Sequence, residues 1–458
     1  MGKKIVLIIY LFFEFLIFGN IYANEVKINS LENLTISYLK KREYFSTMLL
    51  EKTKVEDNKT IYTSYLSDSI KVFAKIQIPE TKMPKSGYPV IIITHGRVGV
   101  GNAPLWNFGD NDKSLTGNLA KEYRSLGYVV VIPGYRGHGS INGEIAEGLE
   151  YLYAYDNESY LIPTFYAIDV VNLIEGIDSL NNIEISSSKK NKFKKYQSSS
   201  SKNLKINLNE LCLIGEGQGG DVALTVLGIM GENTTKNKIK AASIWSGYIA
   251  DRDSQLQTFG PMNKTIKAFI SGDGNWTSEA KGISGKLNKD FIFGFPSEKI
   301  KDIDINSKNA TLEVYGLSSE NVENVIKNEY DEMYSVFNNY VRELSCATYS
   351  YNNKNGITHD MLVSKYIKQI GGYNSESYIT EPLIFHFSDR DFNSQAKWNY
   401  SMVKRLRKNN IESTAFEYKG NTSKLEKSKN KWFSPENTKG GFYIATKIDD
   451  LFFNRKKY

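Results

Sequence analysis

Residues Leu211 to Gly220 read L-C-L-I-G-E-G-Q-G-G, and this stretch decides the fold. Four apolar residues of strand length come first, and good helix formers follow from Asp221 to Met230. Between them lies the spacing of a G-x-S-x-G motif, in which small residues allow a sharp turn to lift one side chain above a sheet. Gly217 occupies the central position, where the motif has serine. The sequence therefore predicts the strand, turn and helix of a nucleophile elbow without its nucleophile.

Apolar runs of strand length alternate with helical patterns along most of the chain. The expected strands are residues 47–52, 61–66, 70–78, 89–94, 128–133, 211–214, 239–246, 382–387 and 412–418. The expected helices are residues 34–39, 114–126, 163–180, 221–230, 394–409 and 440–453. Alternation of this kind is typical of a mostly parallel sheet whose strands are joined by right-handed crossovers. We therefore expect an α/β fold with an antiparallel edge at 61–78.

Residues 1–23 have the pattern of a secretory signal peptide. Lys3 and Lys4 precede an apolar run from Ile5 to Phe18, in the order that such a signal requires. An uncleaved anchor is the alternative, because Ile21 is larger than the residue that a cleavage site prefers. We expect an exported protein, periplasmic or secreted, with no membrane span once the signal is removed.

Composition divides the remaining chain into four parts. They are an N-terminal segment packing on the core (24–59), the first part of the core (60–250), an insertion (251–380) and the second part of the core (381–458). An insertion this long between two core strands is usually a lid or cap. Within the first part of the core, residues 186–205 hold seven lysines and no acidic residue. We interpret them as a solvated loop, with contact to an anionic surface as the alternative.

Charge and cysteine content narrow the classes of partner. The formal net charge is +7, but no nucleic-acid-binding motif surrounds the lysines, so we expect no nucleic-acid partner. Two cysteines do not make a disulfide framework, and we expect Cys212 and Cys346 to be buried thiols. We find no pattern that calls for a cofactor.

Several motifs occur together in one order and spacing. They are L-K-K-R-E-Y at 39–44, Y-P-V-I-I-I-T-H-G at 88–96, G-Y-R-G-H-G-S at 134–140, A-I-D-V-V-N at 167–172, and S-D-R-D with W-N at 388–399. With these motifs the chain resembles the α/β-hydrolase superfamily of the prolyl-oligopeptidase and dienelactone-hydrolase type. The resemblance covers 30–253 and 382–458. It implies an α/β-hydrolase fold, with a mostly parallel central sheet flanked by helices and a long cap-like insertion.

The family mechanism uses a serine, a carboxylate and a histidine, in that chain order. The resemblance places the carboxylate at Asp391, seven residues before Trp398, with Asp389 as the fallback. It places the histidine at Ser423, and no histidine lies beyond residue 386. The resemblance therefore implies a degenerate triad that keeps its acid but has Gly217 and Ser423 at the other two positions.

Asp389, Asp391 and Asn393 also have the spacing of a calcium-binding loop. Ser394 stands where such a loop needs glycine, and Tyr400 stands where it needs glutamate. We therefore expect no metal there.

The resemblance implies an oxyanion hole, built from the backbone N–H groups of Gln218 and of the loop near Arg97, with Gly96 beside them. The start of the helix at Gln218 adds its positive end. We expect a carboxylate or phosphate to bind there even though acylation does not occur. Glu216 is an alternative general base for water, although its side chain should point away from position 217.

Arg136 and Asp169 resemble family positions that we expect to pair beneath the site in a structural role. We expect structural roles for His95, His138 and His386 as well, so His359 in the insertion is the histidine that could approach the site in an unconventional way. The sequence predicts an exported, serine-hydrolase-like protein that is catalytically inactive and binds a small acyl or peptide-like ligand. Two alternatives remain: an active ester or peptide hydrolase with a non-standard site, and an envelope interaction protein.

Overall fold

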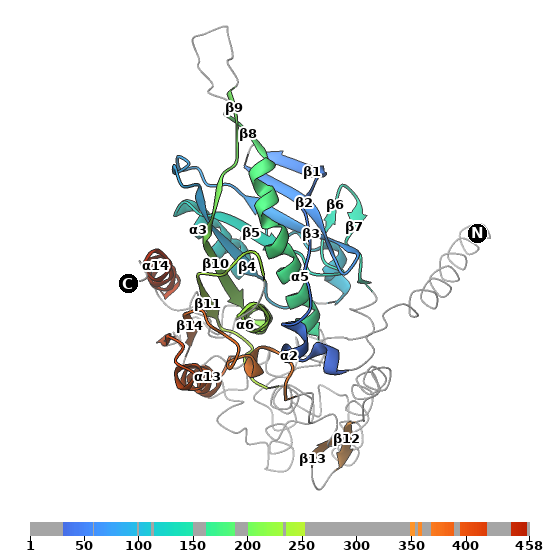
Figure 1. The fold of residues 1–458 in the computed structure, drawn as a ribbon, viewed down its shortest axis with the longest axis vertical. Helices are drawn as coiled ribbons and strands as arrows, with labels where there is room; N and C mark the ends of the chain where they lie inside the picture. Colours follow the sequence, from blue (N-terminus) through green and yellow to red (C-terminus); the bar gives the residue numbers. More distant parts are fainter. Residues whose placement is uncertain are drawn as a thin grey trace, which may run out of the picture.

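A computed structural model gives the architecture of the protein (Figure 1). It describes residues 31–57, 59–98, 100–110, 114–149, 162–187, 200–231, 235–251, 349–352, 356–359, 368–388, 394–418 and 441–455. The signal peptide, the tip of the lysine-rich loop, Cys346, Asp389, Asp391 and Ser423 therefore lie outside the described residues. Within the described part of the chain, no helix is both long enough and apolar enough to cross a membrane.

Nine strands of the described chain form one sheet in the order β1-β2-β3-β5-β4-β10-β11-β14-β15. Their bounds are β1 (Leu49–Asp57), β2 (Thr60–Ser67), β3 (Ile70–Gln77), β4 (Tyr88–Thr94), β5 (Val129–Pro133), β10 (Ile206–Glu216), β11 (Ala241–Trp245), β14 (Leu383–Ser388) and β15 (Ser413–Tyr418). From β5 to β15 all neighbours are parallel, whereas β1, β2 and β3 form an antiparallel edge. The carboxyl ends of β4, β10, β11, β14 and β15 therefore meet at one edge of the sheet.

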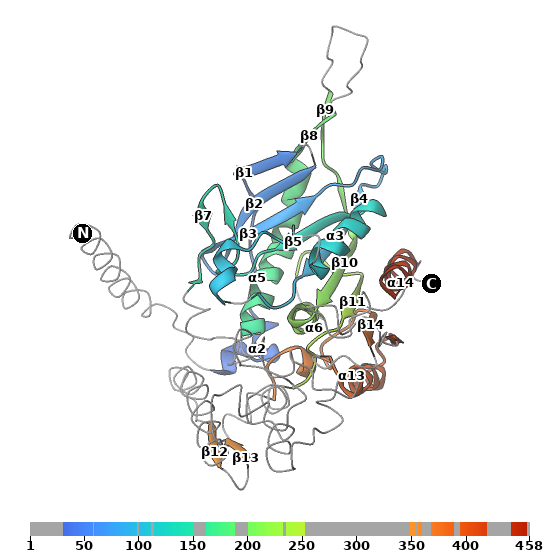
Figure 2. The same cartoon turned by 180° about the vertical axis from the view of Figure 1, so that it is seen from behind.

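Helices cover both faces of this sheet (Figures 1 and 2). They are α2 (Ile36–Leu39), α3 (Leu115–Ser125), α5 (Ile162–Gly176), α6 (Gln218–Met230), α13 (Ala396–Lys408) and α14 (Gly441–Asn454). Apolar residues of α2, α5, α6 and α13 share one buried cluster, and those of α3 and α14 share another. This arrangement confirms the predicted α/β-hydrolase fold, with a mostly parallel sheet between two helical layers.

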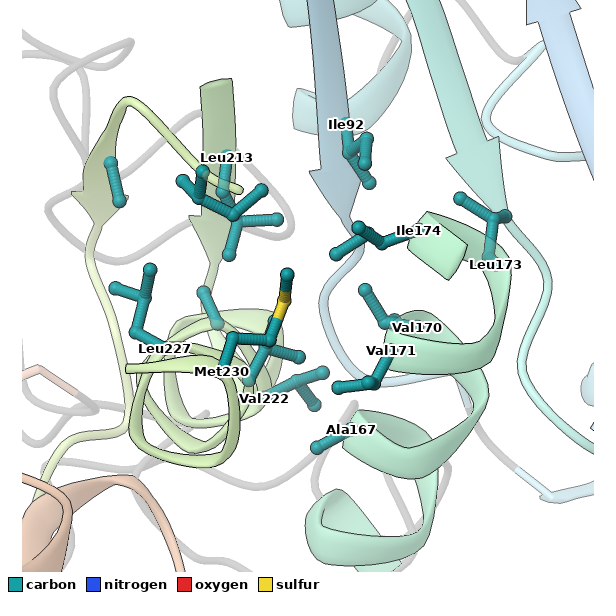
Figure 3. Packing of buried hydrophobic residues seen from close by; sticks show 14 of the residues in the cluster. Ile92, Ala167, Val170, Val171, Leu173, Ile174, Leu213, Val222, Leu227 and Met230 are labelled. Carbon is teal, nitrogen blue, oxygen red and sulfur yellow. The ribbon is translucent and has the colours of Figure 1, made fainter. Parts of the chain in front are cut away.

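The central strands are apolar throughout because both of their faces are covered. In β4, Val90 and Ile92 belong to the cluster under α5 and α6, whereas Ile91 and Ile93 belong to the cluster under α3 and α14. Side chains of successive strand residues point to opposite faces. Figure 3 shows Ile92 and its neighbour Leu213 of β10 facing the apolar sides of the two helices. The elbow strand is thus fixed by packing on both faces.

Element bounds differ from the sequence-based expectation in several places, and the elbow strand β10 is longer than the expected 211–214. The first strand runs from Leu49 to Asp57 rather than over 47–52. The helix expected over 163–180 is α-helical only to Gly176 and continues as the 3-10 helix η5 (Ile177–Asn182). Gly372, near the end of the predicted insertion, contacts the core: its N–H donates to Asp221 Oδ1 of α6 at 2.7 Å.

Short hairpins complete the described chain. They are β6 (Ser140–Ile141) with β7 (Glu144–Ile145), β8 (Glu184–Ser187) with β9 (Ser200–Asn203), and β12 (Tyr349–Asn352) with β13 (Gly356–His359). The pair β8 and β9 projects away from the sheet and carries the two ends of the lysine-rich loop (Figure 1). His359 ends β13, and no side-chain contact of it is described.

Candidate functional site

The turn from β10 into α6 has the geometry of a nucleophile elbow. Gly217 adopts φ 52° and ψ −121°, a region that L-residues avoid and glycine tolerates. The flanking glycines are needed for close approach, because a Cβ at Gly215 would lie 2.5 Å from the carbonyl oxygen of Gly219, and one at Gly219 would collide with that of Thr94. The backbone conformation of an elbow is thus present although its central residue carries no side chain.

Hydrogen bonds fix this turn against the neighbouring strand β11. Gly217 N–H donates to the Trp245 carbonyl at 3.0 Å, and its own carbonyl accepts from Tyr248 N–H at 2.9 Å and from Gly220 N–H at 3.0 Å. A Cβ built on Gly217 would have Gly96 Cα and Tyr248 Cζ as its nearest atoms, both at 3.7 Å. Position 217 therefore has room for a side chain, and the cost of adding one is backbone strain.

Gln218 begins α6 directly after the elbow and is 8% exposed. Within the part of the chain that the structure describes, its backbone N–H donates to no acceptor. The first N–H groups of a helix have no partner inside the helix and carry its positive end. The Gln218 N–H, one of the two backbone donors expected for an oxyanion hole, therefore lies next to position 217. The second donor is expected in the loop near Arg97, which follows β4 and is exposed.

Glu216, the last residue of β10, is turned toward β4. Its Oε1 accepts hydrogen bonds from Gly96 N–H at 2.7 Å and from Thr116 Oγ at 2.8 Å. A side chain at Gly96 would displace this carboxylate, because a Cβ there would lie 2.8 Å from that oxygen. The N–H of Gly96 thus already has an internal acceptor. Glu216 Oε1 ties two strand ends together.

The positions that the resemblance assigns to the acid and the histidine, Asp391 and Ser423, follow β14 and β15 in the sequence. Ser388 and Tyr418 are the last residues of these strands and pair directly across the sheet. The loops that hold Asp391 and Ser423 therefore start side by side, at the same edge as Gly217. The positions of the two side chains stay predictions, because they lie outside the described residues.

His95 and His138 at this edge are buried in an aromatic stack. The His95 ring lies between Trp106 and Tyr135, with centroid distances of 3.9 and 4.0 Å, and its Nδ1 donates to the Gly96 carbonyl. Burial lowers the pKa of His95 well below its usual value and that of His138 to about 4. Both rings are therefore neutral near pH 7, in agreement with a structural role.

His386 belongs to a buried polar network that the sequence did not reveal. Its Nδ1 lies 2.8 Å from Tyr418 Oη, and its Nε2 lies 3.0 Å from Asp449 Oδ1 of α14. The other oxygen of Asp449 accepts from Trp245 Nε1 at 2.9 Å and from the Tyr123 hydroxyl. Asp449 and His386 are fully buried. The network fastens α14 to the sheet and leaves His386 no route to a substrate.

Arg136 and Asp169 form the expected pair. Arg136 Nη2 lies 2.6 Å from Asp169 Oδ1, and the backbone N–H of Arg136 donates to Oδ2 at 2.8 Å. Ser67 Oγ donates to the same carboxylate at 2.6 Å. Both charged side chains are at most 1% exposed. These contacts join the loop after β5 to α5 and to the end of β2, in agreement with the structural role that we expect for the pair.

Asp389, Asp391 and Asn393, whose spacing resembles a calcium loop, lie outside the described residues, so the expectation of no metal there stays a prediction. Among the described residues, no group of three or more His, Cys, Asp or Glu side chains is arranged to hold a metal ion. Cys212 is a buried thiol, as predicted, and burial raises its pKa.

No protein-family model matches this sequence, and neither does any curated protein sequence. Solved structures of similar fold include acetyl xylan esterase 1 from Thermoanaerobacterium sp. JW/SL YS485, at 11% identity and TM-score 0.38, with 85% of each chain covered. They also include an acetyl xylan esterase from Paenibacillus sp. R4, at 11% identity and TM-score 0.42, covering 93% of this chain and 99% of the esterase. An acylaminoacyl peptidase from Pyrococcus horikoshii is similar at 13% identity and TM-score 0.43, covering 87% of this chain but only 42% of the peptidase. Similarity this low carries no conclusion about substrate or activity.

Proposed function

We propose that the protein is an exported, non-catalytic binding protein on an α/β-hydrolase scaffold, and that it holds a small acyl or peptide-like ligand at the elbow. The observation that carries this proposal is Gly217, which keeps the backbone conformation of an elbow at φ 52° and ψ −121° while providing no nucleophile. Glycine adopts this region without strain, so the turn needs no serine to keep its shape. The retained turn leaves the Gln218 N–H beside position 217 with no acceptor among the described residues, which supports a site that receives a ligand.

The ligand's carbonyl or carboxylate oxygen would lie at the start of α6. The Gln218 N–H offers a donor at the positive end of a 13-residue helix. The space in which a serine side chain would stand is bordered by Gly96 Cα and the Tyr248 ring. A polar group on the ligand can therefore approach the Gln218 N–H more closely than a serine would permit.

Covalent catalysis by the family mechanism requires a nucleophile and a base that this chain replaces with Gly217 and Ser423. Triad members act as a unit, so the loss of two leaves only the roughly 10³- to 10⁴-fold acceleration that binding and oxyanion stabilisation supply. We therefore propose binding, with negligible turnover of esters. The active-hydrolase alternative requires a different way to activate water.

Calorimetry on the chain without residues 1–23 tests this proposal, with acetate and N-acetylglycine as probes. We expect both carboxylates to bind at millimolar concentration and to raise the melting temperature by mass action. The variant Gln218→Pro removes the N–H donor at a helix position where proline is tolerated, and it should abolish binding. Gln218→Ala keeps the N–H and should bind as the parent does. Failure of the parent to bind either probe, or unchanged binding by a folded Gln218→Pro variant, would contradict the proposed site.

A further inference from the structure

The outer face of α14 is apolar, whereas a helix on a protein surface usually turns a polar face to solvent. Ile444 and Leu451 are 55% and 74% exposed, and Ile448 between them is partly exposed. Residues three and four positions apart are neighbours on a helix surface, so these three side chains form one stripe, with the 65% exposed Tyr443 beside its start. The helix lies at the outer margin of the described fold in both views (Figures 1 and 2).

The opposite side of α14 fixes the orientation of the helix. Asp449 is fully buried there, accepts from Trp245 Nε1 at 2.9 Å and lies 3.0 Å from His386 Nε2. Ala445 and Phe453 belong to the apolar cluster beneath the helix. Rotation of α14 therefore cannot bury the stripe. Exposed apolar side chains that form one contiguous patch mark a contact surface.

Cationic side chains accompany the stripe. Lys447 is exposed one turn before Leu451, and it has no ion pair in the described part of the chain. Arg455 follows the helix, with its Cζ 4.1 Å from the centroid of the Phe452 ring, and two more lysines come next in the sequence. The acidic residues of α14 do not offset them at the surface, since Asp449 is buried and Asp450 accepts from the Tyr128 hydroxyl.

A basic groove of about 960 Å³ adjoins the end of α14. It is lined by residues 208–210, residues 236–240, Asn454 and Arg455. Among these lining residues, three lysines and one arginine stand against one acidic residue, Glu210. The basic residues stay in excess when the ion-pair partners Asp178 and Glu412 are added. The positive charge at the end of the stripe thus extends to the starts of β10 and β11.

This combination of side chains fits a lipid surface better than a second copy of the chain. A symmetric dimer would place the same patch on both sides of the contact, so the Lys447 side chains of the two copies would repel each other. At a membrane surface, lysine instead lays its stem on apolar atoms and extends its charge to the headgroups, and tyrosine favours the same interface. Helices that lie in this interface have an apolar face accompanied by lysine and arginine.

We propose that the outer face of α14 binds an anionic lipid surface. The stripe enters the boundary between headgroups and acyl chains, while Lys447 and Arg455 lie at the lipid phosphates. This is a surface contact of one helix and involves no membrane span. It does not depend on the function proposed at the elbow.

Co-sedimentation with lipid vesicles tests this surface, using the chain without residues 1–23 so that the apolar run there cannot contribute. Vesicles of equal parts phosphatidylcholine and phosphatidylglycerol are compared with vesicles of phosphatidylcholine alone. We expect binding to the anionic vesicles and little to the neutral ones. Added salt should weaken the binding, because it screens the attraction between the basic residues and the lipid phosphates.

Leu451→Glu is the decisive variant, and Leu105→Glu is its matched control. Leu105 ends the 3-10 helix η3 (Val100–Leu105) and is 75% exposed, against 74% for Leu451. Both variants lose the same apolar side chain and gain the same charge, and neither should change the melting temperature. Leu451→Glu should weaken vesicle binding by about tenfold or more, whereas Leu105→Glu should bind as the parent does.

A second pair of variants tests the charge. Lys447→Gln should weaken binding to anionic vesicles about fivefold, the effect of one basic residue at such a surface. Lys404→Gln changes an exposed lysine of α13 and should bind like the parent. The proposal is overturned if neutral vesicles bind as well as anionic ones, or if Leu451→Glu binds like Leu105→Glu. It is also overturned if light scattering shows a dimer of the parent that Leu451→Glu converts to a monomer, since a second copy would then cover the stripe.

Discussion

Glu216 and Gly96 are joined across two neighbouring parallel strands by a 2.7 Å hydrogen bond from the Gly96 backbone N–H to the Glu216 carboxylate. Glu216 is the last residue of β10, Gly96 follows the end of β4 by two residues, and Gly96 Cα lies 3.7 Å from a Cβ built on Gly217. An acidic side chain has thus taken up one backbone N–H of the loop that the resemblance assigns to the oxyanion hole. This contact keeps the loop and the elbow at a fixed separation.

Replacing Glu216 by leucine should destabilise the protein by about 1–3 kcal/mol, because the Gly96 N–H and the Thr116 hydroxyl lose their acceptor. The free energy of unfolding, measured in urea, checks this. Glu43→Leu is the control, since Glu43 is exposed, and it should change stability by no more than about 0.5 kcal/mol. Equal effects of the two substitutions would show that the contact between strand ends contributes nothing.

Restoring the missing serine should make the protein less stable. At φ 52° a serine is strained by roughly 1–3 kcal/mol, and the 3.7 Å clearance shows that crowding does not add to that cost. We therefore expect Gly217→Ser to lower the free energy of unfolding by about 1 kcal/mol or more. Gly143→Ser is the matched control for backbone strain alone, since Gly143 has φ +83° and nothing within 4 Å of the added Cβ. If Gly143→Ser is destabilised but Gly217→Ser is not, the elbow is not held in its strained conformation.

The buried network around Asp449 should contribute strongly to stability. In Asp449→Ala, Trp245 Nε1 and the Tyr123 hydroxyl both lose their buried acceptor, and His386 Nε2 loses its partner. We expect a loss of about 2 kcal/mol or more. Asp450→Ala is the control on the same helix, since Asp450 is only partly buried and accepts from the Tyr128 hydroxyl at 2.9 Å. Thermal melting of both variants tests this. If the network around Asp449 contributes nothing to stability, the two variants should show equal and small decreases in melting temperature.

Stability should fall in mild acid because of the buried histidines. The pKa of His138 is about 4 in the folded protein and about 6.5 when unfolded, so between these values the unfolded state binds more protons. The contribution is intact above pH 6.5 and is lost as the pH falls toward 4, at a cost on the order of 3 kcal/mol. His138→Gln should therefore show a shallower decline in urea stability between pH 6.5 and 4 than the parent. Parallel pH profiles of the two proteins would contradict this assignment.

The architecture was readable from the sequence where local pattern and tertiary packing agree. Ile91 and Ile92 face opposite layers of helices, and an unbroken apolar run is the signature of a strand covered on both sides. The glycines at 215 and 219 also predicted the turn. The structure gives the reason: backbone atoms occupy the space that a side chain at either position would need.

Contacts between distant residues were not readable in this way. Nothing near Asp449 in the sequence indicates that His386 and Trp245 converge on it, because the sheet order brings them together. The direction of Glu216 was only half anticipated: its carboxylate lies against Gly96, a contact that depends on the register between β10 and β4. The exposure of Leu451 had no sequence signal either, since the buried contacts of Asp449 set the orientation of α14. Asp391 and Ser423 stay predictions.

The double variant Gly217→Ser with Ser423→His tests whether these two positions and Asp391 correspond to a catalytic triad. Asp391 would be available to orient the new imidazole, and the elbow would present the new hydroxyl at position 217. We expect this variant to regain slow hydrolysis of activated esters and to remain less stable than the parent. An inert but folded double variant would contradict the assignment of Ser423 and Asp391.

The most direct test of the central claim is intact-mass measurement of the parent protein, without residues 1–23, after treatment with a fluorophosphonate. Such a reagent forms a covalent adduct with a serine that a base activates. Because Gly217 holds the nucleophile's place, we predict no adduct on the parent under conditions that label the double variant. Stoichiometric addition of one phosphonyl group to the parent would contradict the account and reveal an active hydrolase with a different site.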